Sequence, residues 1–454
     1  MTSTKLEVQT PMGPCTIDMQ SFYDANRSVK SASSKTAEQL CSEGWLGSKA
    51  SGKTQWYGHR LGLLMVSELP RFLDQERLAV CRTTNFVDRG NRETDPSYCD
   101  VRVSVDDTVQ VPTSSTMLVE CQDAGTRLVI SVGVDCDGDI RLNVYYNRKD
   151  DEALRLASTF HRDFSRFFVA NGPLKGSVFD GSLAFLARDT HASQKLVLPS
   201  NVERSVTRHI TDFIAMRDKL LAKGQETNRG VILSGAPGTG KTLLIRSIIE
   251  QTDLTVIVLT SEQAAERGKI SETYKMASRY APSIIVLEDI DNGAGIHRRL
   301  RDHPILAECL NALDGISRNN GIFTIASTNY LDRMDPALTD RPGRFCRVID
   351  VPVPNHESRL RLLKNLSSEF GFDLTYKERE KLAKATNGLT GDWLRETART
   401  AEIIALQDGR DSICYDDLEE ALRDVNDNRG IAHRQTPELA PPGANSTIGE
   451  CVYD

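Results

Sequence analysis

The stretch GAPGTGKT at residues 235–242 decides how the second half of this chain folds. It fits the phosphate-loop pattern G-x-x-x-x-G-K-[ST], in which a glycine-rich turn joins a buried strand to a helix. Apolar residues 231–233 precede it, and a helical apolar pattern begins at Thr242. Backbone N–H groups of such a turn surround phosphate oxygens, and the helix dipole faces the anion. The predicted binding residues are Gly235, Ala236, Pro237, Gly238, Thr239, Gly240, Lys241 and Thr242.

Within this loop, two side chains have separate predicted roles. Lys241 is expected to reach the β- and γ-phosphates of ATP, and Thr242 is expected to ligate Mg²⁺. The same pattern occurs a second time, as GSKASGKT at residues 47–54. No apolar strand precedes that copy, and the residues after Thr54 are a poor start for a helix. We therefore interpret the second copy as a chance match.

Composition restricts the classes of protein to which the chain can belong. The 454 residues are 39% hydrophobic and 26% charged, with a net charge of -7. Two or three domains are expected from this length. A mildly acidic chain does not favour a nucleic-acid partner. The sequence has no apolar run long enough for a membrane helix, no signal-peptide pattern and no CxxC pair among its 10 cysteines. These features predict a cytoplasmic protein without a membrane anchor.

Continuous apolar stretches recur through the second half, at residues 231–234, 255–260, 283–288, 321–328 and 347–353, with helical stretches between them. Strands of this kind predict a parallel sheet with helices on both faces. Ligands of such sheets bind at the carboxyl ends of the strands. Three polar side chains follow two of these strands, namely Glu288, Asp289 and Asn329.

The first half has a different pattern of apolar residues. Short alternating stretches between about residues 78 and 147 predict a β-rich region, and VGVDCDGDIRLNV predicts a hairpin with its turn at Asp137-Gly138. Residues 151–170 have the apolar spacing of an amphipathic helix. The pattern of residues 356–428 predicts helices, and the polar, proline-rich tail from Gly430 is predicted to be disordered.

The second half of the chain resembles the nucleotide-binding module of AAA ATPases. The motifs GAPGTGKT, APSIIVLEDID, LNALDGI, IASTN, MDPAL and RPGRF occur in the order of that family. The resemblance implies a P-loop α/β fold with a C-terminal helical lid, which here follows a β-rich α+β domain. It predicts four parts: an N-terminal domain (1–195), an ATPase subdomain (196–354), a lid (355–428) and a disordered tail (429–454).

The resemblance also implies roles for individual residues. Glu288 would hold Mg²⁺ through water, Asp289 would act on the attacking water, and Asn329 would orient it. Arg341 and Arg344 stand where arginine fingers reach the nucleotide of a neighbouring subunit, which implies a homo-oligomeric ring, expected to be a hexamer. The family usually has Asp before Glu; the order Glu288-Asp289 is similar to that of the Bcs-type AAA ATPases.

Two further departures from the family pattern bear on function. The segment Thr260–Ser271, where the family has its pore loop, is short and lacks an aromatic residue. In the lid, Asp392-Trp393 replaces the family's Ala-Asp, which places an acid beside the nucleotide.

Three functions remain open from the sequence. The first is an ATP-hydrolysing ring that remodels a protein substrate or adaptor bound through residues 1–195. The second is a nucleotide-dependent scaffold with little turnover, which the Glu288-Asp289 order and the altered pore loop favour. The third is a nucleic-acid motor, for which Arg298, Arg299 and Arg301 form the only compact basic cluster near the site.

Overall fold

The computed structural model describes residues 5–10, 13–18, 35–87, 92–290, 321–331 and 345–435. The chain divides into two compact units between Ser177 and Val178. The sequence-based boundary after residue 195 is therefore too late. Residues 178–180 form a three-residue strand that pairs in parallel with residues 256–258 of the second unit. This strand is short and follows a turn that contains glycine and proline, so its sequence resembles that of a linker. Only its pairing with β12 identifies it as a strand of the second unit.

The first unit is built on an antiparallel sheet with the strand order β3-β9-β8-β7-β4-β5, and β6 pairs with β7. Its strands are β3 (Ala50–Tyr57), β4 (Leu78–Val87), β5 (Arg92–Thr94), β6 (Ser97–Arg102), β7 (Thr108–Cys121), β8 (Arg127–Val134) and β9 (Ile140–Asn147). A separate hairpin, β1 (Lys5–Thr10) with β2 (Gly13–Asp18), precedes them and was not expected from the sequence. The predicted hairpin is confirmed: β8 and β9 pair, and Gly138 takes a φ of 87° in the turn.

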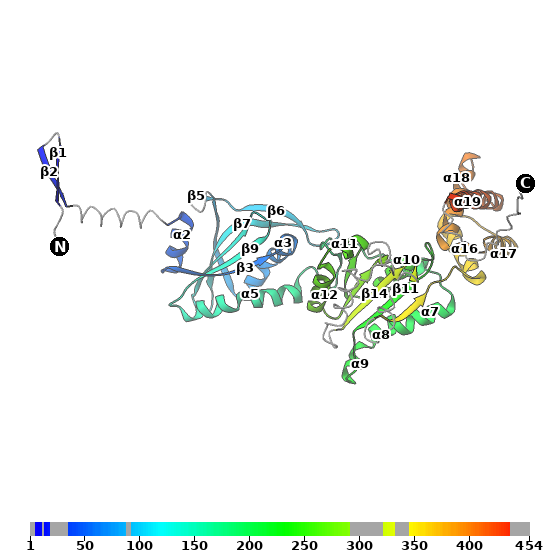
Figure 1. Ribbon diagram of the computed structural model, residues 1–454, viewed down its shortest axis with the longest axis horizontal. Coiled ribbons are helices and arrows are strands. Elements are labelled where there is room, and N and C mark those ends of the chain that lie inside the picture. The colour runs from blue at the N-terminus through cyan, green and yellow to red at the C-terminus, as the bar shows by residue number, and fades with distance from the viewer. Residues whose placement is uncertain are drawn as a thin grey trace, which may run out of the picture. The chain divides into compact units, whose positions relative to one another are not determined.

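Helices cover this sheet (Figure 1). They are α2 (Ala37–Leu46), α3 (His59–Ser67), α4 (Leu69–Gln75) and α5 (Asp151–Asn171). The last of these confirms the predicted amphipathic helix. Its Phe160, Phe164 and Phe167 gather around Phe72 of α4, with ring centroids 5.0–5.5 Å apart. Aromatic contacts of this geometry add to the stabilisation from burial alone and fix α5 on α4.

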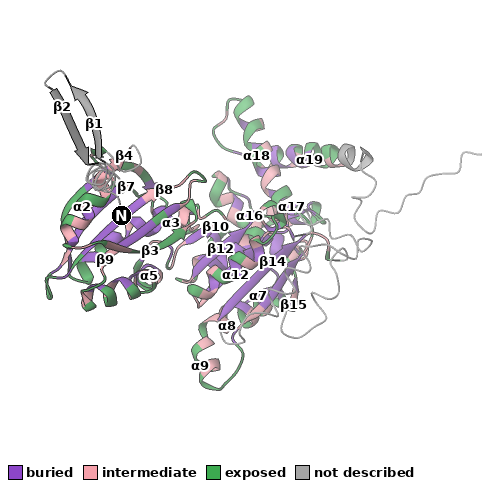
Figure 2. Ribbon diagram, turned by 60° about the vertical axis from the view of Figure 1, so that its left-hand side comes forward, coloured by how far each residue is buried: buried purple, intermediate pink, exposed green. Residues whose placement is uncertain are grey.

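The second unit contains a six-stranded sheet with the order β10-β12-β13-β14-β11-β15, in which every pairing is parallel. The strands are β10 (Val178–Asp180), β11 (Arg229–Ser234), β12 (Thr255–Leu259), β13 (Ser283–Leu287), β14 (Ile322–Thr328) and β15 (Phe345–Asp350). The central strands are buried along almost their whole length, as the purple ribbons in Figure 2 show. The prediction of a parallel, doubly covered sheet is confirmed.

Helices connect and cover these strands. They are α6 (Ala192–Lys195), α7 (Ser200–Val206), the π-helical turn η1 (Thr207–Thr211), α8 (Asp212–Ala215), α9 (Arg217–Ala222), α10 (Lys241–Glu250), α11 (Ser261–Ala265) and α12 (Lys269–Arg279). The core between helices and sheet includes Leu244 and Ile248 of α10 against Val231, Val256 and Ile325 of the strands. This apolar layer holds the start of α10 at the carboxyl end of β11. No helix in the described ranges is long and apolar enough to cross a membrane.

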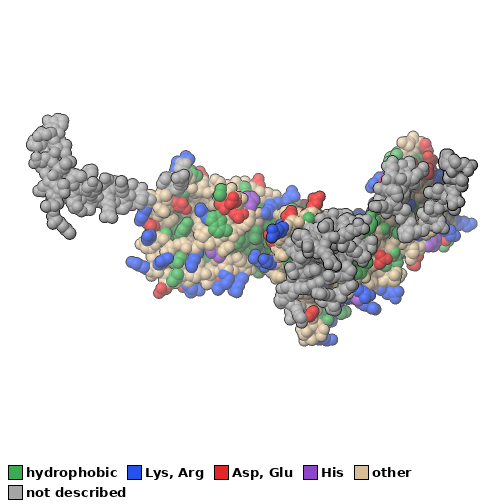
Figure 3. Space-filling model, in the orientation of Figure 1, with side chains coloured by type: hydrophobic (Ala, Val, Ile, Leu, Met, Phe, Trp, Pro, Cys, Tyr) green, Lys and Arg blue, Asp and Glu red, His purple; other side chains and the backbone are tan. Residues whose placement is uncertain are grey.

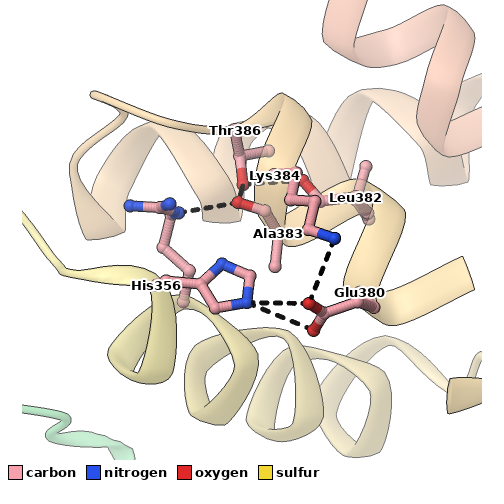
Figure 4. Close-up of polar contacts among 7 residues, drawn as sticks. His356, Glu380, Leu382, Ala383, Lys384 and Thr386 are labelled. Atoms are coloured by element: carbon pink, nitrogen blue, oxygen red, sulfur yellow. Dashed lines mark hydrogen bonds and ion pairs between the residues drawn. The ribbon is translucent and has the colours of Figure 1, made fainter. Parts of the chain in front are cut away.

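Four helices form the lid: α16 (His356–Phe370), α17 (Tyr376–Ala385), α18 (Gly391–Gln407) and α19 (Tyr415–Gln435). The last helix continues to residue 435, so the predicted tail begins too early; residues 436–454 lie outside the described residues. Figure 4 shows polar contacts that join the first two helices. His356 Nε2 lies 3.1 Å from Glu380 Oε1, and Lys384 Nζ lies 3.5 Å from the same oxygen.

A buried arginine connects the lid helices more strongly. Arg359 is 5% exposed, and its guanidinium donates to the Ala383 carbonyl and the Pro354 carbonyl, both at 2.8 Å. We expect Arg359→Met to lower the free energy of unfolding by about 2–4 kcal/mol, because two enclosed carbonyls lose a charged donor. Urea unfolding measures this change. Arg399→Met, at an exposed position of α18 with a surface ion pair to Glu396, should change stability by less than about 0.5 kcal/mol. Equal effects of the two variants would contradict a structural role for Arg359.

Candidate functional site

Three polar segments meet at the carboxyl edge of the parallel sheet. The phosphate loop follows β11, Glu288 and Asp289 follow β13, and Asn329 follows β14. β14 lies between β11 and β13 in the sheet, so the end of β14 is next to the ends of both other strands. The sheet order thus places residues nearly 90 positions apart in the sequence within hydrogen-bonding reach.

The conformation of the phosphate loop requires glycine at several positions. Gly238 and Gly240 have φ angles of 77° and 99°, in the region that side-chain-bearing residues rarely adopt. At Gly235, an added Cβ would lie 2.3 Å from the Val351 carbonyl oxygen. The loop is therefore packed closely against the end of β15, with α10 starting directly after it. This is the strand, turn and helix geometry that the motif needs to enclose phosphate oxygens.

Lys241 is held at the centre of the site. Its side-chain Nζ donates to the carbonyl oxygens of Gly235 and Ala236 at 2.7 and 3.1 Å, and to Asn329 Oδ1 at 2.7 Å. The residue is only 6% exposed. Its ammonium is thus directed back over the loop, which is the position from which it can contact a bound phosphate chain.

Asp289 and Asn329 form the other side of the site. Asn329 Nδ2 donates a long hydrogen bond of 3.5 Å to Asp289 Oδ1, and the Asp289 backbone N–H donates to Ser327 Oγ at 3.0 Å. Asp289 has a φ of 45°, which is uncommon for a non-glycine residue and concentrates at functional sites. The contact with Ser327 was not expected from the sequence, because it depends on the register between β13 and β14.

Glu288 and Thr242 supply oxygen atoms suited to a magnesium ion. Burial raises the pKa of the Glu288 carboxyl, the charge of Asp289 raises it further, and Arg246 on α10 lowers it. The Thr242 side chain is exposed at the start of α10. Carboxylate and hydroxyl oxygens are the hard ligands that Mg²⁺ prefers, and Mg²⁺ retains several waters and phosphate oxygens in such sites. The residues present therefore fit a magnesium-bound nucleotide.

The lid reaches the phosphate loop through the N-terminus of α18. The Asp392 N–H lies 3.4 Å from the Gly238 carbonyl oxygen, within a loose hydrogen bond. A Cβ added at Gly238 would lie 2.8 Å from Thr390 Oγ1 and 3.0 Å from Asp392 Oδ2. The sequence alone could not orient Asp392; the packing of the lid directs its carboxylate towards the loop.

The second phosphate-loop match has a different structure. Gly47 ends α2 with a φ of 65°, and residues 50–57 form the edge strand β3. Lys53 pairs with Val144, and Thr54 Oγ1 donates to Asn143 Oδ1 at 2.7 Å. The order here is helix, turn and strand, the reverse of the order that a phosphate-binding turn needs. This geometry agrees with the interpretation of the match as accidental.

Some predicted site residues lie outside the described residues, namely Arg341, Arg344 and the cluster Arg298, Arg299 and Arg301. The segment in the pore-loop position is described. Thr260 caps α11 by a capping box with Gln263, and Gly268 starts α12. The segment forms a short helix and a turn.

A parallel sheet with a glycine-rich loop between a buried strand and helix defines a P-loop nucleotide-binding fold. Comparison with known families agrees: residues 231–353 match the family model described as "ATPase family associated with various cellular activities (AAA)". The parallel-sheet part of the second unit is thus similar to the AAA domain over residues 231–353. The similarity to the Glu-Asp order of Bcs-type proteins stays a prediction.

Curated relatives match the same half of the chain. The ATP-dependent zinc metalloprotease FtsH 2 of Thermoanaerobacter sp. is 34% identical over 226 residues, which cover 48% of this chain and 44% of the relative. The proteasome-activating nucleotidase of Saccharolobus solfataricus is 34% identical over 222 residues, 45% of this chain and 55% of the relative. That of Methanosarcina mazei is 33% identical over 219 residues, 45% and 51% of the two chains. The chain spans about half the length of the curated relatives it matches.

The two lysines of the repeated motif provide a matched test of the site. We expect Lys241→Ala to weaken ATP binding at least about tenfold, because the ammonium above the loop is lost. Lys53→Ala should leave the affinity within about twofold, since Lys53 lies on an exposed edge strand. Isothermal titration calorimetry measures both affinities, and circular dichroism checks that each variant is folded. Loss of binding in Lys53→Ala alone would assign the nucleotide to the first unit.

Proposed function

We propose that the chain is an ATP-hydrolysing AAA protein that assembles into a ring and remodels or translocates a protein substrate. The observation that carries the ATPase proposal is the linked arrangement of Lys241, Asn329 and Asp289 at the carboxyl edge of the sheet. Lys241 contacts phosphate, Asn329 connects the two sides of the site, and Asp289 supplies a carboxylate at the end of its strand. This is the set of groups that phosphoryl transfer to water needs.

In the proposed reaction, ATP binds with its phosphates on the backbone N–H groups of residues 238–242 and with Lys241 on the β- and γ-phosphates. Thr242 and Glu288 would hold Mg²⁺, which would supply neutralisation of phosphate charge. Asp289 accepts a hydrogen bond from the attacking water and receives its proton as the water bonds to the γ-phosphorus and the bond to ADP breaks. Asn329, already directed towards Asp289, holds that water in line.

The ring and the protein substrate rest on weaker support. Arginine fingers at Arg341 and Arg344 would complete each site across a subunit boundary, which requires self-association, expected as a homohexamer. The names of two relatives, a protease and a proteasome-activating nucleotidase, favour a protein as the substrate class. The 454 residues contain no His-Glu-x-x-His stretch, so the metalloprotease activity in the first name is not carried over. The first unit is the proposed binding part for substrate or adaptor.

The nucleic-acid alternative has little support in the described part of the molecule. On the face of the first unit seen in Figure 3, basic and acidic side chains are interspersed. Salt-dependent binding to DNA or RNA needs clustered basic side chains. The scaffold alternative differs from the leading proposal only in turnover, so a rate measurement separates them.

The test is ATP hydrolysis per subunit over a range of protein concentrations. A rate that rises and then saturates would support sites completed by assembly. Asp289→Asn should lower kcat by about 100-fold or more while the affinity for ATP changes less than about threefold, because the general base is lost and the phosphate loop is intact. Asp373→Asn, at an exposed position between α16 and α17, is the matched control and should keep the wild-type rate. Bound ATP with no turnover in the wild type would favour the scaffold.

A further inference from the structure

The contact between the lid and the phosphate loop has an unusual charge. Asp392 Oδ2 lies 3.0 Å from the point where a side chain at Gly238 would begin, and Gly238 is in the middle of the loop. The Asp392 residue is also exposed to solvent. A carboxylate therefore stands next to the turn whose N–H groups are arranged for phosphate.

The helix that carries Asp392 would otherwise favour an anion at this place. α18 has 17 residues, and its first turn faces the loop. The N-terminus of such a helix carries a partial positive charge and free N–H groups. Thr390 is at the N-cap, but its side chain makes no capping hydrogen bond, and its buried Oγ1 has no hydrogen-bond partner among the residues that the structure describes. Asp392, two residues after the cap, is the acidic residue of the first turn.

A full negative charge at the second helical position outweighs the partial positive charge of the helix end. The phosphate chain of a nucleotide on the loop then meets an anion instead of a helix N-terminus. Near a protein surface, unit charges several Å apart interact strongly enough to change a binding constant by about three- to tenfold. The interaction grows with the number of phosphates, so ATP is affected more than ADP.

We propose that Asp392 weakens nucleotide binding by electrostatic repulsion, and weakens ATP binding more than ADP binding. This inference rests on the proposed ATP-binding function. Its consequence is a site that binds ATP less tightly and discriminates less against ADP than the phosphate loop alone would. The lid thereby sets the affinity of the site for nucleotide through the Asp392 side chain, which lies on α18 and not on the phosphate loop.

The test is Asp392→Asn, which removes the charge, retains nearly the same shape and leaves Thr390 and Gly391 in place. With Mg²⁺ present, we expect a non-hydrolysable ATP analogue to bind about three- to tenfold more tightly than to the wild type, and ADP about one- to threefold more tightly. The gain should shrink as salt is raised from 50 mM to 500 mM. Calorimetry measures each dissociation constant.

Glu402→Gln is the matched control. Glu402 is an exposed carboxylate on the same helix, ten residues further along, which places it about 15 Å from Asp392. It removes the same charge from the protein and should leave both affinities unchanged. Thermal unfolding without nucleotide gives an independent check: Asp392→Asn should not raise the Tm of the free protein, because an acid in the first turn stabilises a helix. Tighter binding with no gain in Tm excludes a general stabilisation of the lid.

Each other outcome overturns a definite statement. Unchanged affinities in Asp392→Asn would show that the carboxylate does not act on the phosphates. Weaker binding would show that it supports the nucleotide, for instance through a bound cation, which is the opposite role. An equal gain for ATP and ADP at all salt concentrations would indicate a change in lid position and not repulsion. No binding of the analogue by the wild type would overturn the proposed function itself, and with it this inference.

Discussion

The hydrogen bond from Lys241 Nζ to Asn329 Oδ1, at 2.7 Å, joins the two halves of the site. It exists only because β11 and β14 are neighbours in the sheet and end at the same edge. The same ammonium is bonded to two carbonyls of its own loop, so the loop, the lysine and the end of β14 form one connected group. Asp289 is linked to this group through Asn329, and Glu288 adjoins it along the chain. A change in sheet order or register would separate all of these groups together.

The lid is the second element on which the site depends. Its helices are held together by their own apolar core and by the buried guanidinium of Arg359. It contacts the parallel-sheet part both at α18, beside Gly238, and at α16, where Arg361 donates to the Leu198 carbonyl and Asn365 to the Gln194 carbonyl. The repulsion proposed for Asp392 acts across the contact beside Gly238.

The two phosphate-loop matches show how far a short pattern can be trusted. Residues 47–54 and 235–242 contain the same letters at the same spacing. In the first, the backbone amides of the lysine and threonine belong to a strand ladder with β9. In the second, they begin a helix after two glycines of positive φ. Successive N–H groups of an extended strand point to opposite sides and do not converge on one anion, so the flanking residues decide the function.

Local patterns in the sequence predict the parallel sheet, the phosphate loop at residues 235–242, the helical lid and the candidate residues Glu288, Asp289 and Asn329. These follow from local patterns: buried strands are continuously apolar, and the loop's glycines mark its turn. Tertiary structure alone decided that β10 belongs to the second unit, that Ser327 supports Asp289, and that Asp392 faces Gly238. Each of these is a contact between segments at least 38 residues apart. Such contacts depend on strand order, register and helix packing, which no local pattern of residues encodes.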